Sequence, residues 1–383
     1  LGSIIIYLLV GARFVLEIFN EEVRLQDLAM VGRLCAAIVD TVSVGMLFYL
    51  GRRVFDQKVA FLASALMAVM VINIQVSHFY RPESFIMLLA LIAFWWMLNV
   101  IEKQRLIDHL VLGIVIGVTF SFRGSSVPIF APLAVLYGSL IWRDYQFYMR
   151  WSEALRRNIP KSLCAFATSI LVFAILQPYA FLDFYKYFGD LGWEAGIART
   201  AGLVPYTLQY VGMTRTGIYE LQQTILWAMG IPLGLLAWLG LAVSIIAAVK
   251  RPTFKSWLLL SWVLCLLLGI IPFFEVKFLR YVIPVLPIMV LLGSYWLVQL
   301  FQIAKKKSFL LQYVVGILGA LVVVLTLLYA LSFVGIYKQK HPAIQASEWV
   351  NTNASKGDVI LTDNHWDEGF PNLSKFRIAQ LRM

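Results

Sequence analysis

Long apolar runs separated by short polar connections cover most of this sequence. Most runs are close to the ~20 residues that a helix needs to cross ~30 Å of hydrocarbon. The pattern therefore predicts about ten transmembrane helices in an all-α polytopic membrane protein, with the short fourth and fifth runs either spanning or partly re-entrant. The runs lie at about residues 28–50, 59–77, 85–101, 108–122, 126–142, 162–179, 225–249, 256–274, 281–300 and 309–334.

Basic residues gather in every second connection between these runs. An excess of Lys and Arg in short connections is typical of the cytoplasmic side. The remaining connections, at residues 20–27, 78–84, 123–125, 180–224 and 275–280, and the tail from about residue 335 are then predicted to lie outside. The basic residues that set this orientation are Arg52, Arg53 and Lys58, then Lys103 and Arg105, then Arg143, Arg150, Arg156, Arg157 and Lys161, then Lys250, Arg251 and Lys255, and finally Lys305, Lys306 and Lys307.

Composition supports a multi-pass protein of a plasma or inner membrane. Of the 383 residues, 61% are hydrophobic and 14% charged, and the mean hydropathy is +0.79, beyond what a soluble domain carries. The net charge of +11 resides largely in the basic connections, which argues against nucleic acid as a partner. Cys35, Cys164 and Cys265 lie in apolar runs and are interpreted as core residues.

Two segments that flank the transmembrane domain 28–334 and one long connection inside it are predicted to form structure of their own. In residues 1–27, Arg13 and Glu17 are spaced for one helix face, so a juxtamembrane helix in the interface is as compatible with the pattern as a spanning one. The connection 180–224 is interpreted as a partly helical lid or acceptor-facing loop. The segment 335–383 shows helical spacing at 343–353 and a strand pattern at 358–362, typical of a small α/β domain. Neither end resembles a natural terminus, and we expect both to be truncated.

Ionisable residues at the ends of three predicted outer connections suggest a site for an anionic, lipid-borne ligand, because charge at a lipid boundary is costly. Arg81 and Glu83 flank a proline before the third run, and Arg123 stands in a Gly- and Ser-rich turn that suits a phosphodiester. Each of these residues also has a simpler interpretation as an interfacial anchor. Lys277 and Arg280 share a face if their segment is helical.

Further features of the charged segments qualify this hypothesis. Pro284 and Pro287 are expected to kink the span that follows Arg280. Arg33, near the predicted outer end of the first span, is a candidate member of the cationic cluster. Asp40, near the middle of that span, suits an ion pathway or pairing with another helix.

Motifs of ATP hydrolysis, zinc proteolysis, paired CxxC metal binding and serine hydrolysis are absent from the sequence. No cofactor is predicted, no metal ligands are assigned, and the sequence leaves a requirement for a divalent metal open.

The motifs resemble, in order and spacing, those of the polytopic GT-C glycosyltransferases, in particular the dolichyl-phosphate-mannose protein mannosyltransferases and the bacterial aminoarabinose transferases. A tail pattern from Ala346 to Asn353, followed by His365-Trp366-Asp367, is similar to bacterial carrier-dependent members. The motifs are Val31-Gly-Arg33-Leu, Tyr49-Leu-Gly-Arg52-Arg53-Val-Phe, Ser77-His-Phe-Tyr-Arg81-Pro-Glu83, Phe120-Ser-Phe-Arg123-Gly and Lys277-Phe-Leu-Arg280-Tyr281-Val-Ile-Pro284.

The resemblance implies inverting transfer of a sugar from a polyprenyl-phosphate carrier to a lipid, glycan or protein acceptor on the extracytoplasmic face. It implies that Arg123, Lys277, Arg280 and Tyr281 line the phosphate site and that Glu83 is an auxiliary acid. Arg123 replaces a Lys of many relatives, and Glu83 replaces an Asp. The family's principal catalytic acid lies before the first residue of this chain, so we expect the chain as given to be inactive.

Two other classes of protein compete with this interpretation. A secondary transporter of an anionic solute requires ionisable residues at mid-membrane and related halves, whereas Asp40 alone is clearly central and no repeat is seen. A membrane scaffold requires the charged cluster to be structural.

Overall fold

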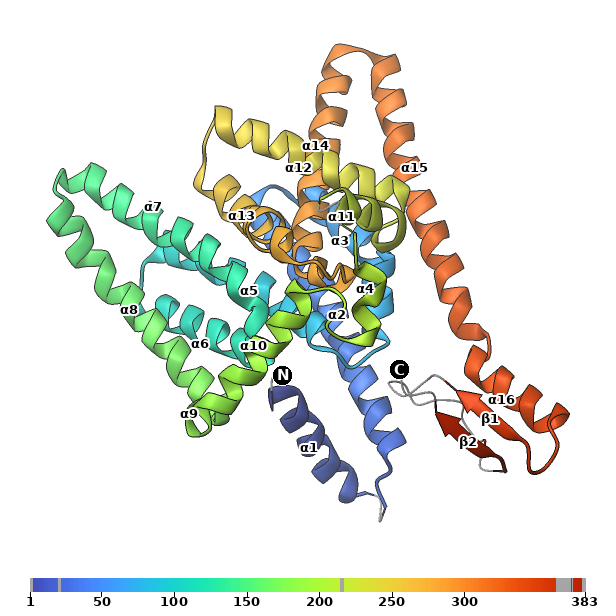
Figure 1. Ribbon diagram of the computed structural model, residues 1–383. Coiled ribbons are helices and arrows are strands. Elements are labelled where there is room, and N and C mark those ends of the chain that lie inside the picture. Colours follow the sequence, from blue (N-terminus) through green and yellow to red (C-terminus); the bar gives the residue numbers. More distant parts are fainter. Residues whose placement is uncertain (1–2, 20–21, 214–216, 363–372, 374, 381–383) are drawn as a thin grey trace. The chain divides into compact units, whose positions relative to one another are not determined.

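The computed structural model describes residues 3–19, 22–213, 217–362, 373 and 375–380, and these residues are predominantly helical (Figure 1). The chain divides into two units, Leu1–Leu327 and Leu328–Met383. The first unit begins with α1 (Ser3–Glu17), α2 (Leu25–Val54), α3 (Gln57–Ala68), α4 (Val71–Ser77), α5 (Pro82–Lys103), α6 (Leu106–Phe122), η1 (Gly124–Ile129), α7 (Phe130–Tyr148) and α8 (Trp151–Leu176). Its later long helices are α12 (Ile231–Lys250), α13 (Phe254–Leu264), α14 (Leu286–Lys307) and α15 (Phe309–Val334), the last of which continues into the second unit.

The ten predicted spans correspond to helical segments of the structure. Within the described residues, eight segments are long and apolar enough to cross a membrane, and they contain α2, α5, α7, α8, α12, α13, α14 and α15. The pair α3 and α4, bent by 57° at a short break, accounts for the second predicted span. The fourth is α6, an apolar helix of 17 residues. The predicted all-α polytopic fold is confirmed.

The core of the first unit forms around α5 and α14, the most buried of the candidate spans. In α14 every residue from Leu286 to Ser294 is buried, the pattern of a helix surrounded by protein. The two helices pack against α2, α3, α6 and α12. The same two helices begin beside the charged connections that hold Glu83 and Arg280, so the core fixes the positions of those connections.

Glycines permit close packing of α6 on α8. Gly113 and Gly117 are about one turn of α6 apart. A Cβ atom added to Gly113 would lie 2.3 Å from the carbonyl oxygen of Ala165 in α8. One added to Gly117 would lie 2.5 Å from the carbonyl oxygen of Ser169. Small residues at this spacing let helix backbones approach closely in a membrane. The contact fixes the end of α6, after which Arg123 follows.

The predicted outer connection 180–224 is partly helical, as its mixed composition indicates. Gln177, which is 1% exposed, ties its start to the bundle: the side-chain amide donates to the carbonyl of Ser121 at 3.1 Å, and its oxygen accepts from Ser3 at 2.7 Å. The elements of the connection are α9 (Tyr179–Leu182), α10 (Phe184–Arg199), η2 (Pro205–Tyr210), α11 (Ile218–Gln223) and the π-helical turn η3 (Thr224–Ala228).

The chain between α13 and α14 is irregular, which corrects two expectations. Residues 274–278 are not helical. The backbone N–H of Val276 donates to the carbonyl of Ala198 instead of bonding within a helix. Lys277 and Arg280 therefore share no helix face. Pro284 and Pro287 do not kink a helix: they lie in η7 and in the first turn of α14, where a missing N–H is tolerated. The turns of this segment are η4 (Cys265–Ile270), η5 (Ile271–Phe273), η6 (Leu279–Tyr281) and η7 (Ile283–Val285).

Tyr80 fixes the connection between α4 and α5. Its hydroxyl donates to the carbonyl of Ile5 in α1 at 2.9 Å, and its ring lies so close to Gly32 of α2 that a Cβ atom there would come within 2.8 Å of the ring. Burial, with a smaller contribution from the Cys35 thiol, raises the pKa of Tyr80 to about 12. The hydroxyl therefore stays protonated and available as a donor near neutral pH.

The second unit contains the end of α15 and a small α/β segment. The predicted helix at 343–353 is α16 (Pro342–Asn353), preceded by η8 (Gly335–Lys338), and the predicted strand at 358–362 is β1 (Val359–Thr362). A second strand, β2 (Arg377–Gln380), pairs with β1 in parallel, with Val359 opposite Arg377 and Thr362 opposite Gln380. His365, Trp366 and Asp367 lie outside the described residues.

Candidate active site

A cavity of about 50 Å³ lies where three charged segments meet in the first unit. It receives Glu83 from the first turn of α5, Arg123 and Ser126 from the junction of α6 and η1, and Arg280 and Tyr281 from η6. Apolar residues of α13 and the irregular segment close it, including Trp262, Leu266, Ile270 and Phe274. The structure thus brings together four of the residues that the sequence assigned to the phosphate-binding site and its auxiliary acid.

Glu83 and Arg123 form an ion pair across the cavity wall. Nη1 of Arg123 donates to Oε1 of Glu83 at 2.8 Å, and the Glu83 side chain is 4% exposed against 27% for Arg123. Pro82 occupies the first turn of α5, where its fixed φ suits a helix start and places Glu83 on that turn. The bond to Glu83 engages one nitrogen of the planar guanidinium, which has five N–H donors in all.

Two polar atoms of this cavity are buried and have no hydrogen-bond partner within the described residues. They are Oε2 of Glu83 and Nε of Arg280. Buried polar groups are normally satisfied, so an unsatisfied acceptor and donor that line one cavity indicate a place for a polar ligand. The guanidinium of Arg280 also lies over the ring of Phe278, 4.4 Å from its centroid, a contact that restrains its plane.

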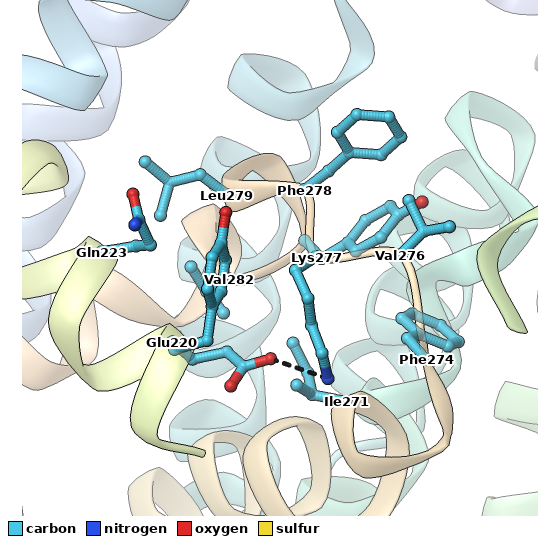
Figure 2. Close-up of a pocket in the computed structure, with 11 residues that line it drawn as sticks. Glu220, Gln223, Ile271, Phe274, Val276, Lys277, Phe278, Leu279 and Val282 are labelled. Carbon is cyan, nitrogen blue, oxygen red and sulfur yellow. Dashed lines mark ion pairs between the residues drawn. The ribbon is translucent and has the colours of Figure 1, made fainter. Parts of the chain in front are cut away.

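Lys277 lies in an adjoining pocket, which shares Phe274 and Tyr281 with the cavity. Its Nζ atom is 3.3 Å from Oε1 of Glu220, and both side chains are buried, at 1% and 8% exposure. Figure 2 shows Glu220 reaching this amine from α11. Oε2 of Glu220 accepts from the backbone N–H of Gly217 at 2.6 Å, which secures the start of α11. The ion pair thereby joins the outer connection to the segment that carries Arg280.

A second link holds the same two segments together. Oε2 of Glu275 accepts from the backbone N–H of Ala201 at 2.8 Å, close in sequence to the bond between Val276 and Ala198. The residues after α10 are therefore attached to the strand-like stretch before η6. These bonds take the place of the helical hydrogen bonds that this stretch lacks.

Arg81 and Arg33 do not line this cavity or its neighbour. Arg81 is exposed, with its guanidinium 5.8 Å from the ring centroid of Phe79. Arg33 is exposed on α2. Within the described residues, no group of three or more His, Cys, Asp or Glu side chains is arranged to hold a metal ion.

Sequence reasoning missed the structural roles of Glu220 and Gln177. The spacing of Gly217 and Glu220, three residues apart, is a signal for a helix start, but it does not identify Lys277 as the partner. Gln177 precedes a proline at the end of an apolar run, which predicts only the end of a helix. Both roles depend on contacts between segments that are far apart in the chain.

Comparisons with known proteins give a family match over part of the chain. Residues 11–182 match the model of the family described as dolichyl-phosphate-mannose-protein mannosyltransferase. No curated protein sequence matches the chain. The family match covers less than half of the chain, and the structural similarity described next shows the fold of a polytopic membrane protein.

Solved structures with a similar fold come from an archaeon and a bacterium. The oligosaccharyltransferase of Archaeoglobus fulgidus, tethered to an acceptor peptide, matches with a TM-score of 0.57 and 14% identity over 93% of this chain and 49% of that chain. The same enzyme in complex with an inhibitory peptide and a dolichol-phosphate matches with a TM-score of 0.56 and 14% identity, over 92% of this chain and 50% of that chain. ArnT of Cupriavidus metallidurans matches with a TM-score of 0.47 and 14% identity, over 92% of this chain and 71% of that chain. The chain thus spans about half the length of the archaeal enzyme.

Proposed function

We propose that this protein transfers a sugar from a polyprenyl-phosphate carrier to an acceptor at the outer surface of the membrane, with inversion at the sugar carbon. The observation that carries the proposal is the cavity in which Arg280 and Arg123 face Glu83, with a donor and an acceptor left unsatisfied. A phosphate-bearing ligand matches this set, because guanidinium groups bind phosphate oxygens through several N–H groups at once.

Arg280 and Arg123 are proposed to bind the phosphate and to stabilise the charge that it gains as the bond to the sugar breaks. Fixed donors in a site with apolar walls act strongly on such charge, since little water screens them. Ser126 and Tyr281 line the same cavity and offer hydroxyl groups.

Glu83 is proposed as an auxiliary acid with two tasks. Its Oε1 holds Arg123 in place, while Oε2 is left to accept a hydrogen bond or a proton from the acceptor hydroxyl. A proton must leave the acceptor oxygen as the new bond to the sugar forms, and a carboxylate in the cavity wall is suited to receive it.

Lys277 is proposed to support this site from the adjoining pocket. Its buried ion pair with Glu220 fixes the segment between η5 and η6, which leads into Arg280. Arg81 and Arg33, exposed and outside the cavity, are proposed to attract the anionic head group before it enters.

The basic connections are proposed to face the cytoplasm, which places the cavity at the outer surface. Residues of the cavity lie at the start of α5 and just before α14, whereas Lys103 and Lys305 lie in the last turns of those helices. The ligands of the solved neighbours, an acceptor peptide in one structure and a dolichol-phosphate in another, support a lipid-linked donor.

Transfer from a radiolabelled polyprenyl-phosphate sugar by full-length protein in proteoliposomes tests this function. We expect labelled acceptor with the unaltered protein and a loss of at least about 100-fold with Arg280→Gln, the scale of removing one donor from a site of developing charge. Arg199→Gln removes the same charge from an exposed position at the end of α10 and serves as the matched control.

The same proteoliposomes separate an enzyme from a transporter. Ion-coupled uptake of an anionic solute without sugar transfer to any acceptor would contradict the proposal. Equal loss of transfer in Arg280→Gln and Arg199→Gln would show that general surface charge, and not the cavity, supports the reaction.

A further inference from the structure

A groove of about 700 Å³ lies between α14 and α15, far from the candidate active site. Its walls are apolar side chains such as Leu297, Phe301 and Val323, and its rim carries Lys58, Lys305 and Lys306. The two helices meet in a hairpin at residue 308, seen in orange in Figure 1. An apolar groove with cationic groups at one end has the amphipathic pattern of a phospholipid.

The three lysines are available to an anion. Each is exposed, and none takes part in a salt bridge within the described residues. Asp56, two residues before Lys58, is occupied by the backbone N–H groups of Lys58 and Val59 at the start of α3. The rim therefore has an excess of positive charge that no acidic side chain among the described residues pairs with.

Small residues keep the groove open along α15. Gly316 and Gly319 face Phe301 and Leu297, and a Cβ atom added at either glycine would stand 3.5 to 3.6 Å from those side chains. A methyl group therefore fits at these positions, but a larger side chain has to enter the groove. Ala320 continues the same lining.

The lysine rim of the groove lies about the thickness of a membrane away from the candidate active site. Arg280 precedes the 22-residue helix α14, and Lys305 and Lys306 end it; a helix of this length spans about 33 Å. A lipid with its phosphate at these lysines therefore belongs to the leaflet beside the basic connections, opposite to the cavity.

We infer that this groove is a binding site for an acidic phospholipid, with its phosphate at Lys58, Lys305 and Lys306 and its acyl chains between α14 and α15. Charge complementarity selects the head group, and the apolar walls accept the chains. Such a lipid fills the space between the last hairpin and the rest of the bundle.

Native mass spectrometry of the full-length protein tests the site, with phosphatidylglycerol as the probe and phosphatidylcholine of the same chains as the neutral comparison. We expect one phosphatidylglycerol to be retained in preference to phosphatidylcholine. Replacement of Lys58, Lys305 and Lys306 by Gln is expected to weaken its retention about 100-fold, since each lysine near a membrane surface contributes about 1 kcal/mol and about 1.4 kcal/mol is a factor of ten.

A matched control removes the same charge from the same end of the bundle. Lys103, Lys250 and Lys307 end α5, α12 and α14 without lining the groove, and replacing these three by Gln is expected to leave retention within about twofold. Equal losses in the two triple variants, or equal retention of the two lipids, would overturn the inference, because either result means diffuse attraction.

A second pair of variants tests the acyl position without changing charge. Ala320→Trp fills the groove and is expected to displace the lipid, whereas Leu321→Trp adds the same ring at an exposed neighbour outside the groove and is expected to leave the lipid bound. Retention that is unchanged in Ala320→Trp would show that the lipid does not lie between α14 and α15.

Discussion

Glu83, Arg123 and Arg280 reach one cavity from three separate parts of the chain. That they would gather was predicted from the sequence, because charge at a lipid boundary is costly. Their partners were not: Glu83 and Arg123 are 40 residues apart, and no local pattern indicates that they pair. Lys277 shows the limit most clearly, because it lies three positions from Arg280 and yet contacts Glu220 in a different pocket.

The buried pair of Lys277 and Glu220 allows a direct test of its structural role. Lys277→Met leaves a buried carboxylate without its cation, and Glu220→Gln leaves a buried amine without its anion, so each is expected to cost about 3–5 kcal/mol of stability. The double variant is expected to lose much less than the sum, because neither charge is then left unpaired. Thermal unfolding of the four proteins in detergent measures this coupling. Strictly additive losses would mean that the two groups do not interact.

At the scale of elements, hydropathy predicted the helices well because burial in lipid requires long apolar runs. The predicted helix at 343–353 and strand at 358–362 also occur, as α16 and β1. The segment between α13 and α14 was predicted less well. Residues 275–280 were expected to form a connection, in which a helical turn would give Lys277 and Arg280 one face. Bonds from Val276 to Ala198 and from Ala201 to Glu275 hold it in an irregular form instead. Those bonds involve residues about 75 positions away, which local periodicity does not report.

The packing of α6 on α8 can be tested with one substitution made at two sites. Gly113→Ala places a methyl group 2.3 Å from a carbonyl oxygen, whereas Gly138→Ala in α7 meets nothing within 4 Å. We expect the first to lower stability by about 1–3 kcal/mol through overpacking, and the second to change it little or raise it by up to ~1 kcal/mol through helix propensity. Melting temperatures in detergent provide the comparison. Equal effects would show that the two helices are not in close contact.

At the scale of the whole first unit, the charges are divided between the two ends of the bundle. The last turns of α5 and α14 carry the lysines Lys103 and Lys305. The starts of the same two helices adjoin the cavity that Glu83 and Arg280 line. The sequence predicted this division from the alternation of basic connections. It did not predict the groove between α14 and α15, because that depends on how far two neighbouring helices separate.

Photo-crosslinking with a diazirine-bearing polyprenyl phosphate tests most directly whether the cavity binds the carrier. We predict labelled peptides from the segments around Arg123 and Arg280, competed by unlabelled polyprenyl phosphate, with labelling reduced about tenfold or more by Arg280→Gln and unchanged by Arg199→Gln. Labelling confined to other segments, or labelling at the cavity that Arg280→Gln leaves intact, would contradict the assignment of this cavity as the phosphate site.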